Sequence, residues 1–190
     1  LDGCLKLTCP SAHYTGLFGG LMKTTRVSGA FLLVAISACA IDDTAGPPQL
    51  GAPIPGYTAA TLEGDSVSLS SLQGEVVLLN LWATWCAPCR KETPFLQELF
   101  EEHQEDGLHL VGVSLDTGAA AEQVQRFVED YGVTYTILHD PENRAMELYR
   151  VLGLPATFLI DRDGVLQWMR YGPVGETDQE FLSKLGDALG

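Results

Sequence analysis

The sequence predicts an α/β fold, and three observations lead to that prediction. Residues 75–82 (EVVLLNLW) form a nearly continuous apolar run of strand length, as in a strand buried on both faces. The motif Trp-Cys-Ala-Pro-Cys follows at residues 85–89, and residues 91–104 beyond it have helical character. Strand-like and helix-like segments then alternate along the rest of the chain, which is typical of an α/β domain.

The later elements follow from hydrophobic period and from turn residues. Asp163-Gly164 between two apolar runs is typical of a hairpin turn. Thr177 or Asp178 is expected to cap a final helix whose apolar residues share one face. The predicted elements after the first helix are a strand at 108–115, a helix at 119–131, a strand at 135–138, a short helix at 143–152, strands at 153–161 and 165–171, and the C-terminal helix.

The two cysteines of the motif are the candidate catalytic residues. At a helix start, residues three apart lie one turn apart, which is close enough for a disulfide. Unpaired N–H groups and the positive end of the helix dipole stabilise a thiolate on the first thiol. Cys86 is therefore the expected nucleophile, and Cys89 the resolving thiol that attacks the mixed disulfide. Pro88 fixes the backbone between the two sulfurs, where a missing N–H costs nothing.

A zinc site or an inert thiol pair is the alternative use of this motif. Structural zinc needs about four ligands. The remaining His103, His109 and His139 supply no His pair at ligand spacing, and there is no second Cys-x-x-Cys. We expect no metal, and no cofactor other than the redox-active Cys86–Cys89 disulfide.

From about Gln49 to Leu189 the chain resembles the thioredoxin-fold family, in its extracytoplasmic TlpA/ResA-like branch within the AhpC/TSA-redoxin group. The pieces that carry the resemblance are WATWCAPC, the following RKETP, VGVSLD and GLPATFLID. The resemblance implies a three-layer fold with a central mixed β-sheet flanked by helices. It also implies an N-terminal extension and an inserted strand–helix segment before the strand that carries a cis proline.

By this resemblance Pro155 is the cis proline that lies against the disulfide and helps to hold a substrate strand. Taken alone, Pro155 could be an ordinary turn proline. Leu154 precedes it, and Trp85 precedes the nucleophile. Trp85, Pro88, Leu154 and Pro155 are therefore the candidate substrate-binding residues.

Glu92 is the third candidate catalytic residue. It lies three residues after Cys89, on the same helix face, and matches a Glu that ResA-like proteins place beside their thiols. A carboxylate there could accept the proton of Cys89, and partial burial would raise its pKa toward a useful range. The alternative is a solvated carboxylate in the first turn of the helix. Asn80, the polar residue of the buried strand, stands where cytoplasmic thioredoxins carry a proton-shuttling Asp, and an Asn cannot shuttle protons.

The amino terminus predicts export. A basic segment at 22–26 and an apolar run at 30–36 are typical of a secretory signal, and the run is well short of the roughly 20 residues that span a membrane. Ile36-Ser37-Ala38-Cys39 resembles a bacterial lipobox, which would make Cys39 the lipidated first residue of the mature chain. A plain signal peptide with a chance cysteine is the alternative.

These features divide the chain into four parts. Because the chain begins with Leu rather than Met, we expect residues 1–21 to be an untranslated or misassigned leader and Met22 to be the start. Residues 22–38 are the expected signal peptide, 39–52 a flexible tether rich in Pro, Gly and Ala, and 53–190 the thioredoxin-like domain. The expected location is the periplasmic side of a bacterial membrane, held by a lipid anchor.

The charge is strongly acidic. From Ala40 onward there are 8 Lys and Arg against 24 Asp and Glu, a net charge of −16. This charge, with no basic patch, argues against nucleic-acid binding and favours solubility and a basic partner surface. We expect a monomer.

Three functional classes compete. The first is a thiol:disulfide oxidoreductase that reduces disulfides in exported proteins, such as apocytochrome c or copper-site assembly factors, with electrons from a membrane thiol–disulfide donor. The second is a peroxiredoxin-like peroxidase, but such enzymes place a Thr three residues before the reactive Cys, where this chain has Ala83. The third is a copper carrier with two Cys and a distant His, but such carriers use Cys-x-x-x-Cys spacing, and His139 is more simply a loop residue.

Overall fold

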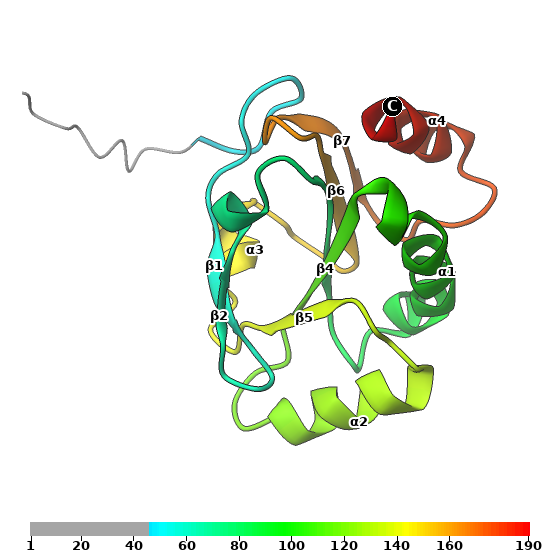
Figure 1. The fold of residues 1–190 in the computed structure, drawn as a ribbon. Coiled ribbons are helices and arrows are strands. Elements are labelled where there is room, and N and C mark those ends of the chain that lie inside the picture. Colours follow the sequence, from blue (N-terminus) through cyan, green and yellow to red (C-terminus); the bar gives the residue numbers. More distant parts are fainter. Residues whose placement is uncertain (1–45) are drawn as a thin grey trace, which may run out of the picture. The chain divides into compact units, whose positions relative to one another are not determined.

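The computed structural model describes residues 46–190 (Figure 1). Seven strands form one sheet in the order β2-β1-β5-β4-β3-β6-β7. The strands are β1 (Thr58–Thr61), β2 (Ser66–Ser68), β3 (Val76–Trp82), β4 (Leu108–Ser114), β5 (Thr136–His139), β6 (Ala156–Ile160) and β7 (Leu166–Tyr171). The α-helices are α1 (Ala87–His103), α2 (Ala121–Tyr131), α3 (Arg144–Leu148) and α4 (Gln179–Leu189), and short 3₁₀ turns span Leu69–Leu72 and Gln104–Asp106. The expected leader, signal peptide and lipidation site at Cys39 lie outside the described residues.

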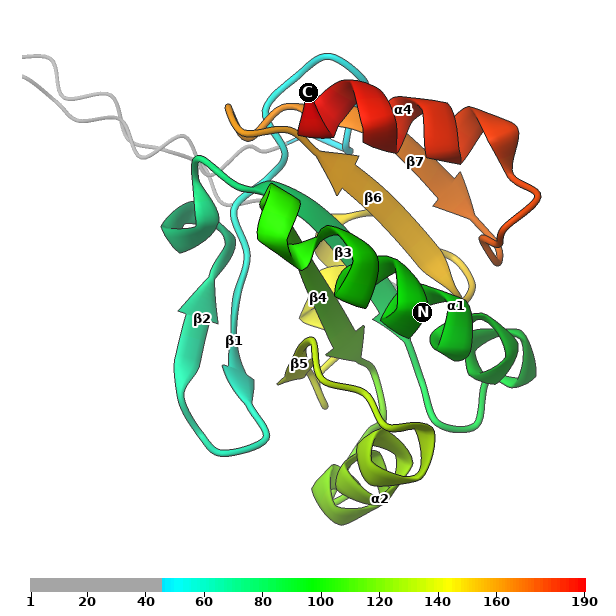
Figure 2. The same ribbon diagram turned by 45° about the vertical axis from the view of Figure 1, so that its right-hand side comes forward.

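The sheet is mixed, as expected. β3 pairs in parallel with β4 and antiparallel with β6, and β4 pairs in parallel with β5. One apolar cluster lies between the sheet and α1, α2 and α4, and a second packs α3 and the N-terminal segment onto the opposite face. Figure 2 shows α1 and α4 in front of the sheet, and in Figure 1 α3 lies on the side of the strands opposite to α1. The expected three-layer arrangement is confirmed.

Strand β3 is central because its sequence tolerates burial on both faces. All of its residues are buried, from Val76 to Trp82. The residues alternate between the two apolar clusters, Val76 and Leu78 facing one and Val77 and Leu79 the other. β3 is an inner strand of the sheet and ends at Trp82. The chain leads from there directly into the cysteine motif.

Two predicted elements are shorter in the structure. The helix predicted at 143–152 ends at Leu148, because Arg150 adopts a left-handed backbone with φ of 54°, which a helix cannot continue. The strand predicted from residue 153 begins at Ala156, after the proline. The expected inserted strand–helix segment is β5 with α3. Asp178, one of the two expected caps, accepts the N–H of Phe181 at the start of α4.

The N-terminal part of the domain contains a hairpin that the sequence did not predict. β1 and β2 pair antiparallel, and β1 also pairs with β5. Residues just before the hairpin are tied to the sheet as well, since the N–H of Gly51 donates to the carbonyl of Leu166 and the N–H of Leu166 donates to that of Ala52. The last residues of the expected tether, Gly51 and Ala52, are therefore hydrogen-bonded to the start of β7.

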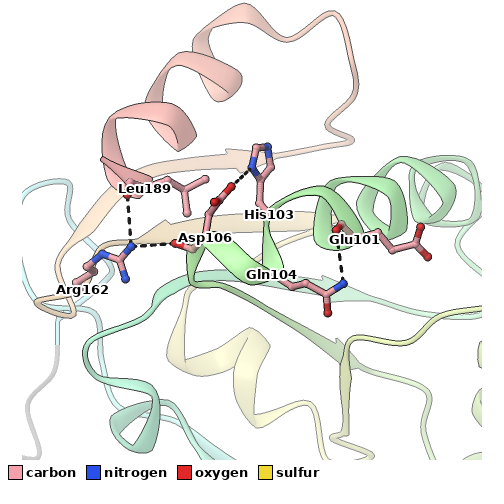
Figure 3. A network of polar contacts seen from close by, with 6 residues as sticks. All are labelled: Glu101, His103, Gln104, Asp106, Arg162 and Leu189. Atoms are coloured by element: carbon pink, nitrogen blue, oxygen red, sulfur yellow. Dashed lines mark hydrogen bonds and ion pairs between the residues drawn. The ribbon is translucent and has the colours of Figure 1, made fainter.

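At one end of the sheet, Arg162 joins three segments that are distant in sequence. Its guanidinium donates to the carbonyls of Gly74 at 3.1 Å, Asp106 at 3.1 Å and Leu189 at 3.4 Å. Figure 3 shows this contact between the end of α4 and the turn after α1, where His103 also bonds to Asp106. The carboxyl end of the chain is thus fixed to the domain at the start of β3. Among residues 46–190, the helices fall short of the length and apolarity that crossing a membrane requires.

Candidate active site

The two cysteines of the motif form a disulfide at the start of α1. Cys86 is the N-cap residue of the helix, and its Cα lies 5.3 Å from that of Cys89. The backbone N–H of Cys89 points at the sulfur of Cys86, with a distance of 3.3 Å. This is one of the helix-start N–H groups that have no partner inside the helix, so it is available to stabilise a thiolate on Cys86.

The two cysteines differ in their exposed fraction, although both are buried. Cys86 is 5% exposed and Cys89 is fully buried. Trp85, directly before Cys86, is 67% exposed, and Pro88 is exposed at the second helical position. A partner disulfide can therefore approach Cys86 past an exposed aromatic side chain, whereas Cys89 is reached only from within the protein.

The peptide bond between Leu154 and Pro155 is cis, as expected. Pro155 is buried and directly precedes β6, whose first residue Ala156 pairs with Leu81 of β3. The proline therefore lies at the sheet edge where β3 leads to the cysteines. Its carbonyl accepts the N–H of Gly172 at 2.8 Å, which extends the pairing of β6 with β7 to this edge. Leu154 packs against the apolar cluster that includes both cysteines.

Glu92 is buried, at 3% exposure, and each of its carboxylate oxygens accepts a hydrogen bond. The amide of Asn80 donates to one oxygen at 2.9 Å and also to the hydroxyl of Thr157 at 3.0 Å. The backbone N–H of Val174 donates to the other oxygen at 3.0 Å. Burial raises the pKa of Glu92 to about 7, although the bonds from Val174 and Asn80 oppose this shift. One helical turn from Cys89, the carboxylate can take or give a proton near neutral pH.

A second buried carboxylate, for which the sequence predicted no role, holds the loop before the cysteines. Asp116 accepts the N–H of Thr84 at 2.9 Å and the hydroxyl of Thr84 at 2.6 Å. The hydroxyl of Ser114 donates to it at 2.9 Å. Asp116 thus fixes the backbone two residues before Cys86, and the hydroxyl of Thr84 is directed at this carboxylate.

The signal for Asp116 was present in the sequence. β3 and β4 are parallel neighbours, so their carboxyl ends meet at the same edge of the sheet, and a polar residue directly after β4 must lie near the loop after β3. The contact of Glu92 with Val174 had no such signal. The two residues are 82 positions apart, and Val174 contributes only its backbone.

His139, considered above as a distant copper ligand, lies at the end of β5. Its Nε2 is 2.9 Å from the backbone carbonyl of Asp116. Within residues 46–190 no group of three or more His, Cys, Asp or Glu side chains is arranged to hold a metal ion.

Known proteins match both the sequence and this arrangement. The AhpC/TSA family profile matches residues 50–169. The thiol-disulfide oxidoreductase ResA of Bacillus thuringiensis subsp. konkukian (strain 97-27) is 33% identical over 138 residues, which cover 72% of this chain and 79% of that protein. A Chlorobium tepidum protein provisionally identified as the thiol:disulfide interchange protein DsbE superposes with a TM-score of 0.70 and 29% identity, covering 75% of this chain and 99% of that one.

A third similar protein is a secreted disulfide oxidoreductase of Mycobacterium tuberculosis, homologous to E. coli DsbE. It superposes with a TM-score of 0.59 and 28% identity, covering 69% of this chain and 95% of that one. The chain therefore belongs to the AhpC/TSA family, in its thioredoxin-fold, ResA-like branch, and is a thiol-disulfide oxidoreductase.

Proposed function

We propose that this oxidoreductase reduces disulfides in exported proteins, with Cys86 as the attacking thiolate and Cys89 as the resolving thiol. The observation that carries the assignment of roles is the difference in position and exposed fraction between the two cysteines. Cys86 lies at the helix start beside exposed Trp85, and Cys89 is fully buried one turn further along. In each cycle the reduced pair gives two electrons to the substrate disulfide, and the Cys86–Cys89 bond forms as the substrate bond breaks.

Replacing Cys89 by Ser tests this assignment. The reduced variant is expected to attack substrate disulfides through Cys86 and to stop at the mixed disulfide, because the resolving thiol is missing. Gel analysis under non-reducing conditions should show adducts that dithiothreitol releases. The matched variant Cys86→Ser should form none. Adducts with Cys86→Ser but not with Cys89→Ser would reverse the two roles.

We propose the reducing direction because the pieces WATWCAPC, RKETP, VGVSLD and GLPATFLID resemble the ResA-like branch, and the chain is 33% identical over 138 residues to a ResA protein. Cytochrome c maturation and copper-site assembly are the processes that we consider first, with a membrane thiol–disulfide protein as electron donor. The reduction potential of the Cys86–Cys89 pair tests the direction. A reductant should have a potential near or below that of thioredoxin, about −270 mV, and a value near −120 mV would indicate an oxidant.

We also propose that the mature protein works outside the cytoplasm as a lipid-anchored monomer. The support is the signal-like segment at 22–38 and the lipobox-like sequence ending at Cys39. A similar structure is that of a secreted protein. Mass spectrometry of the membrane-bound chain should find acyl groups on Cys39, and an unmodified Cys39 would contradict the anchor.

A further inference from the structure

Only some of the positively charged side chains of this acidic protein have a partner among the described residues. Residues 46–190 contain eight Lys and Arg side chains, of which four form ion pairs or hydrogen bonds with other described residues. The other four are exposed and have no such partner among the described residues: Arg90, Lys91, Arg150 and Lys184. Arg90 and Lys91 directly follow Cys89 on α1. The third, Arg150, lies in the loop that leads to Pro155.

Arg150 lines a groove at the sheet edge that carries Pro155. The groove has a volume of about 460 Å³ and is lined by Arg150, Leu152, Gly153, Leu154, Tyr171 and Gly172. Leu152 is 98% exposed and Tyr171 is 53% exposed. With Trp85, these two make up three of the four large hydrophobic side chains that are exposed among the described residues. The groove beside the cis proline therefore has exposed apolar side chains and one cationic side chain in its lining.

The backbone of Arg150 supports a role for its side chain. Its φ of 54° lies in the left-handed region, where glycine is free of strain and a residue with a Cβ is not. Glu147, one turn earlier, lines a neighbouring groove with Arg150, but Arg150 is not among the side chains that form ion pairs in the described residues. Arg150 is thus a cationic side chain at a position that favours glycine. It has no carboxylate partner in the described domain and is available to a ligand.

We infer that the groove selects substrate segments that carry an apolar residue beside the cysteine and a carboxylate next to it. The inference rests on the proposed function and narrows its substrate class. The apolar residue would pack on Leu152 and Tyr171, and Arg150 would bind the carboxylate, a group that matches the guanidinium fork. The net charge of the chain predicts the opposite, a basic partner. A net charge is a sum over the whole chain, so it does not show where the unpaired cations lie.

Disulfide-linked dimers of short peptides provide the test. Each peptide has Leu before its cysteine, and the flanking positions are two Asp, two Gln or two Lys. The protein is reduced beforehand, so that Cys86 and Cys89 supply two electrons as the peptide S–S bond breaks and two peptide thiols are released. Each rate is divided by the rate with dithiothreitol, because flanking charges alter the reactivity of the peptide thiol itself.

The normalised rate is expected to be about threefold to fivefold higher for the Asp peptide than for the Lys peptide, as one exposed ion pair allows. Arg150→Gly should reduce this ratio toward one without loss of folding stability, because glycine relieves the left-handed backbone. Lys184→Glu is the matched control. Lys184 is an unpaired cation that lines a polar pocket with Asp161 and Asp163, beyond the opposite end of β6, and its replacement should leave the ratio unchanged.

The outcomes separate the inference from the proposed function. Equal normalised rates for all three peptides, or faster reduction of the Lys peptide, would overturn the substrate preference and leave the reductase intact. An unchanged ratio in Arg150→Gly would overturn the assignment to this groove. Failure to reduce any of the peptides would contradict the proposed function, and with it this inference.

Discussion

Replacing Glu92 by Gln is expected to slow disulfide exchange by at least about tenfold near pH 7 and to remove a titration near that pH from the rate profile. The resolving step needs a thiolate on Cys89, and burial disfavours that charge. Glu92, whose pKa burial raises to about 7, lies one helical turn away and can accept the proton. The measurement is the pH–rate profile of reduction of a peptide disulfide by wild type and variant.

The same substitution should alter how folding stability depends on pH. A carboxyl whose pKa rises from 4.5 to about 7 on folding holds a proton in the native state that the unfolded chain has released. The free energy of unfolding of wild type therefore falls as pH rises from 4.5 to 7, by on the order of 3 kcal/mol. The amide introduced by Glu92→Gln cannot titrate, so the variant should lack this slope and be the more stable protein at pH 8.

The neighbours of Glu92 can accommodate the Glu92→Gln substitution without losing a hydrogen bond. The oxygen of the introduced amide can accept the N–H of Val174, and Asn80 can turn its own amide so that its oxygen accepts from both the introduced amide and Thr157. Glu98→Gln, an exposed change on the same helix, is the matched control. Superimposable rate profiles for wild type and Glu92→Gln would show that proton transfer runs through water instead.

Replacing Asp116 by Ala is expected to lower the free energy of unfolding by about 3 kcal/mol, because the buried N–H and hydroxyl of Thr84 both lose their acceptor. Asp116→Asn, which keeps one carbonyl oxygen, should cost about half as much. Since the loop from Ala83 to Cys86 is no longer fixed, disulfide exchange should also slow severalfold. Denaturant unfolding and the exchange rate under native conditions measure the two effects.

Amide hydrogen exchange separates positioning from general destabilisation. In Asp116→Ala the amide of Thr84 should lose protection by more than the global loss of stability explains. Asp161→Ala is the matched control, because Asp161 also accepts two backbone N–H groups, from Asp163 and Val165, but beyond the other end of β6. If both variants affect Thr84 and the exchange rate equally, Asp116 has no positioning role.

The parts of the fold that could be predicted are those with a local pattern. The apolar run of β3 and the cysteine motif at the start of α1 can each be recognised from a few consecutive residues. The hairpin of β1 and β2 could not be predicted, because its strands of four and three residues are rich in Thr, Ser and Ala and depend on pairing with β5, far along the chain. The early end of α3 was missed because nothing in the sequence marks the left-handed backbone of Arg150.

In the candidate site, too, features with a local sequence pattern could be predicted, and contacts between distant residues could not. The position of Glu92 on the helix face of Cys89 follows from spacing alone. The interpretation of Glu92 as the proton acceptor of Cys89 required burial, and Glu92 is buried. Its partner Val174 belongs to the loop after β7 and acts through its backbone, so only the folded chain brings the two together. The charge of a partner also depends on the fold, since a net count over the chain does not show which cations already have partners, and the expectation of a basic partner stays a prediction.

The described chain enters and leaves the domain at the same pole, remote from the disulfide. Gly51 is bonded to Leu166 at the start of β7, and Arg162 holds the carbonyl of Leu189. The disulfide follows the other end of β3, a strand whose seven residues extend roughly 20 Å. A domain coupled through either flank to an electrode or a bead would therefore present its disulfide to the solution, so that immobilised protein should exchange with dissolved peptides as freely as the untethered domain.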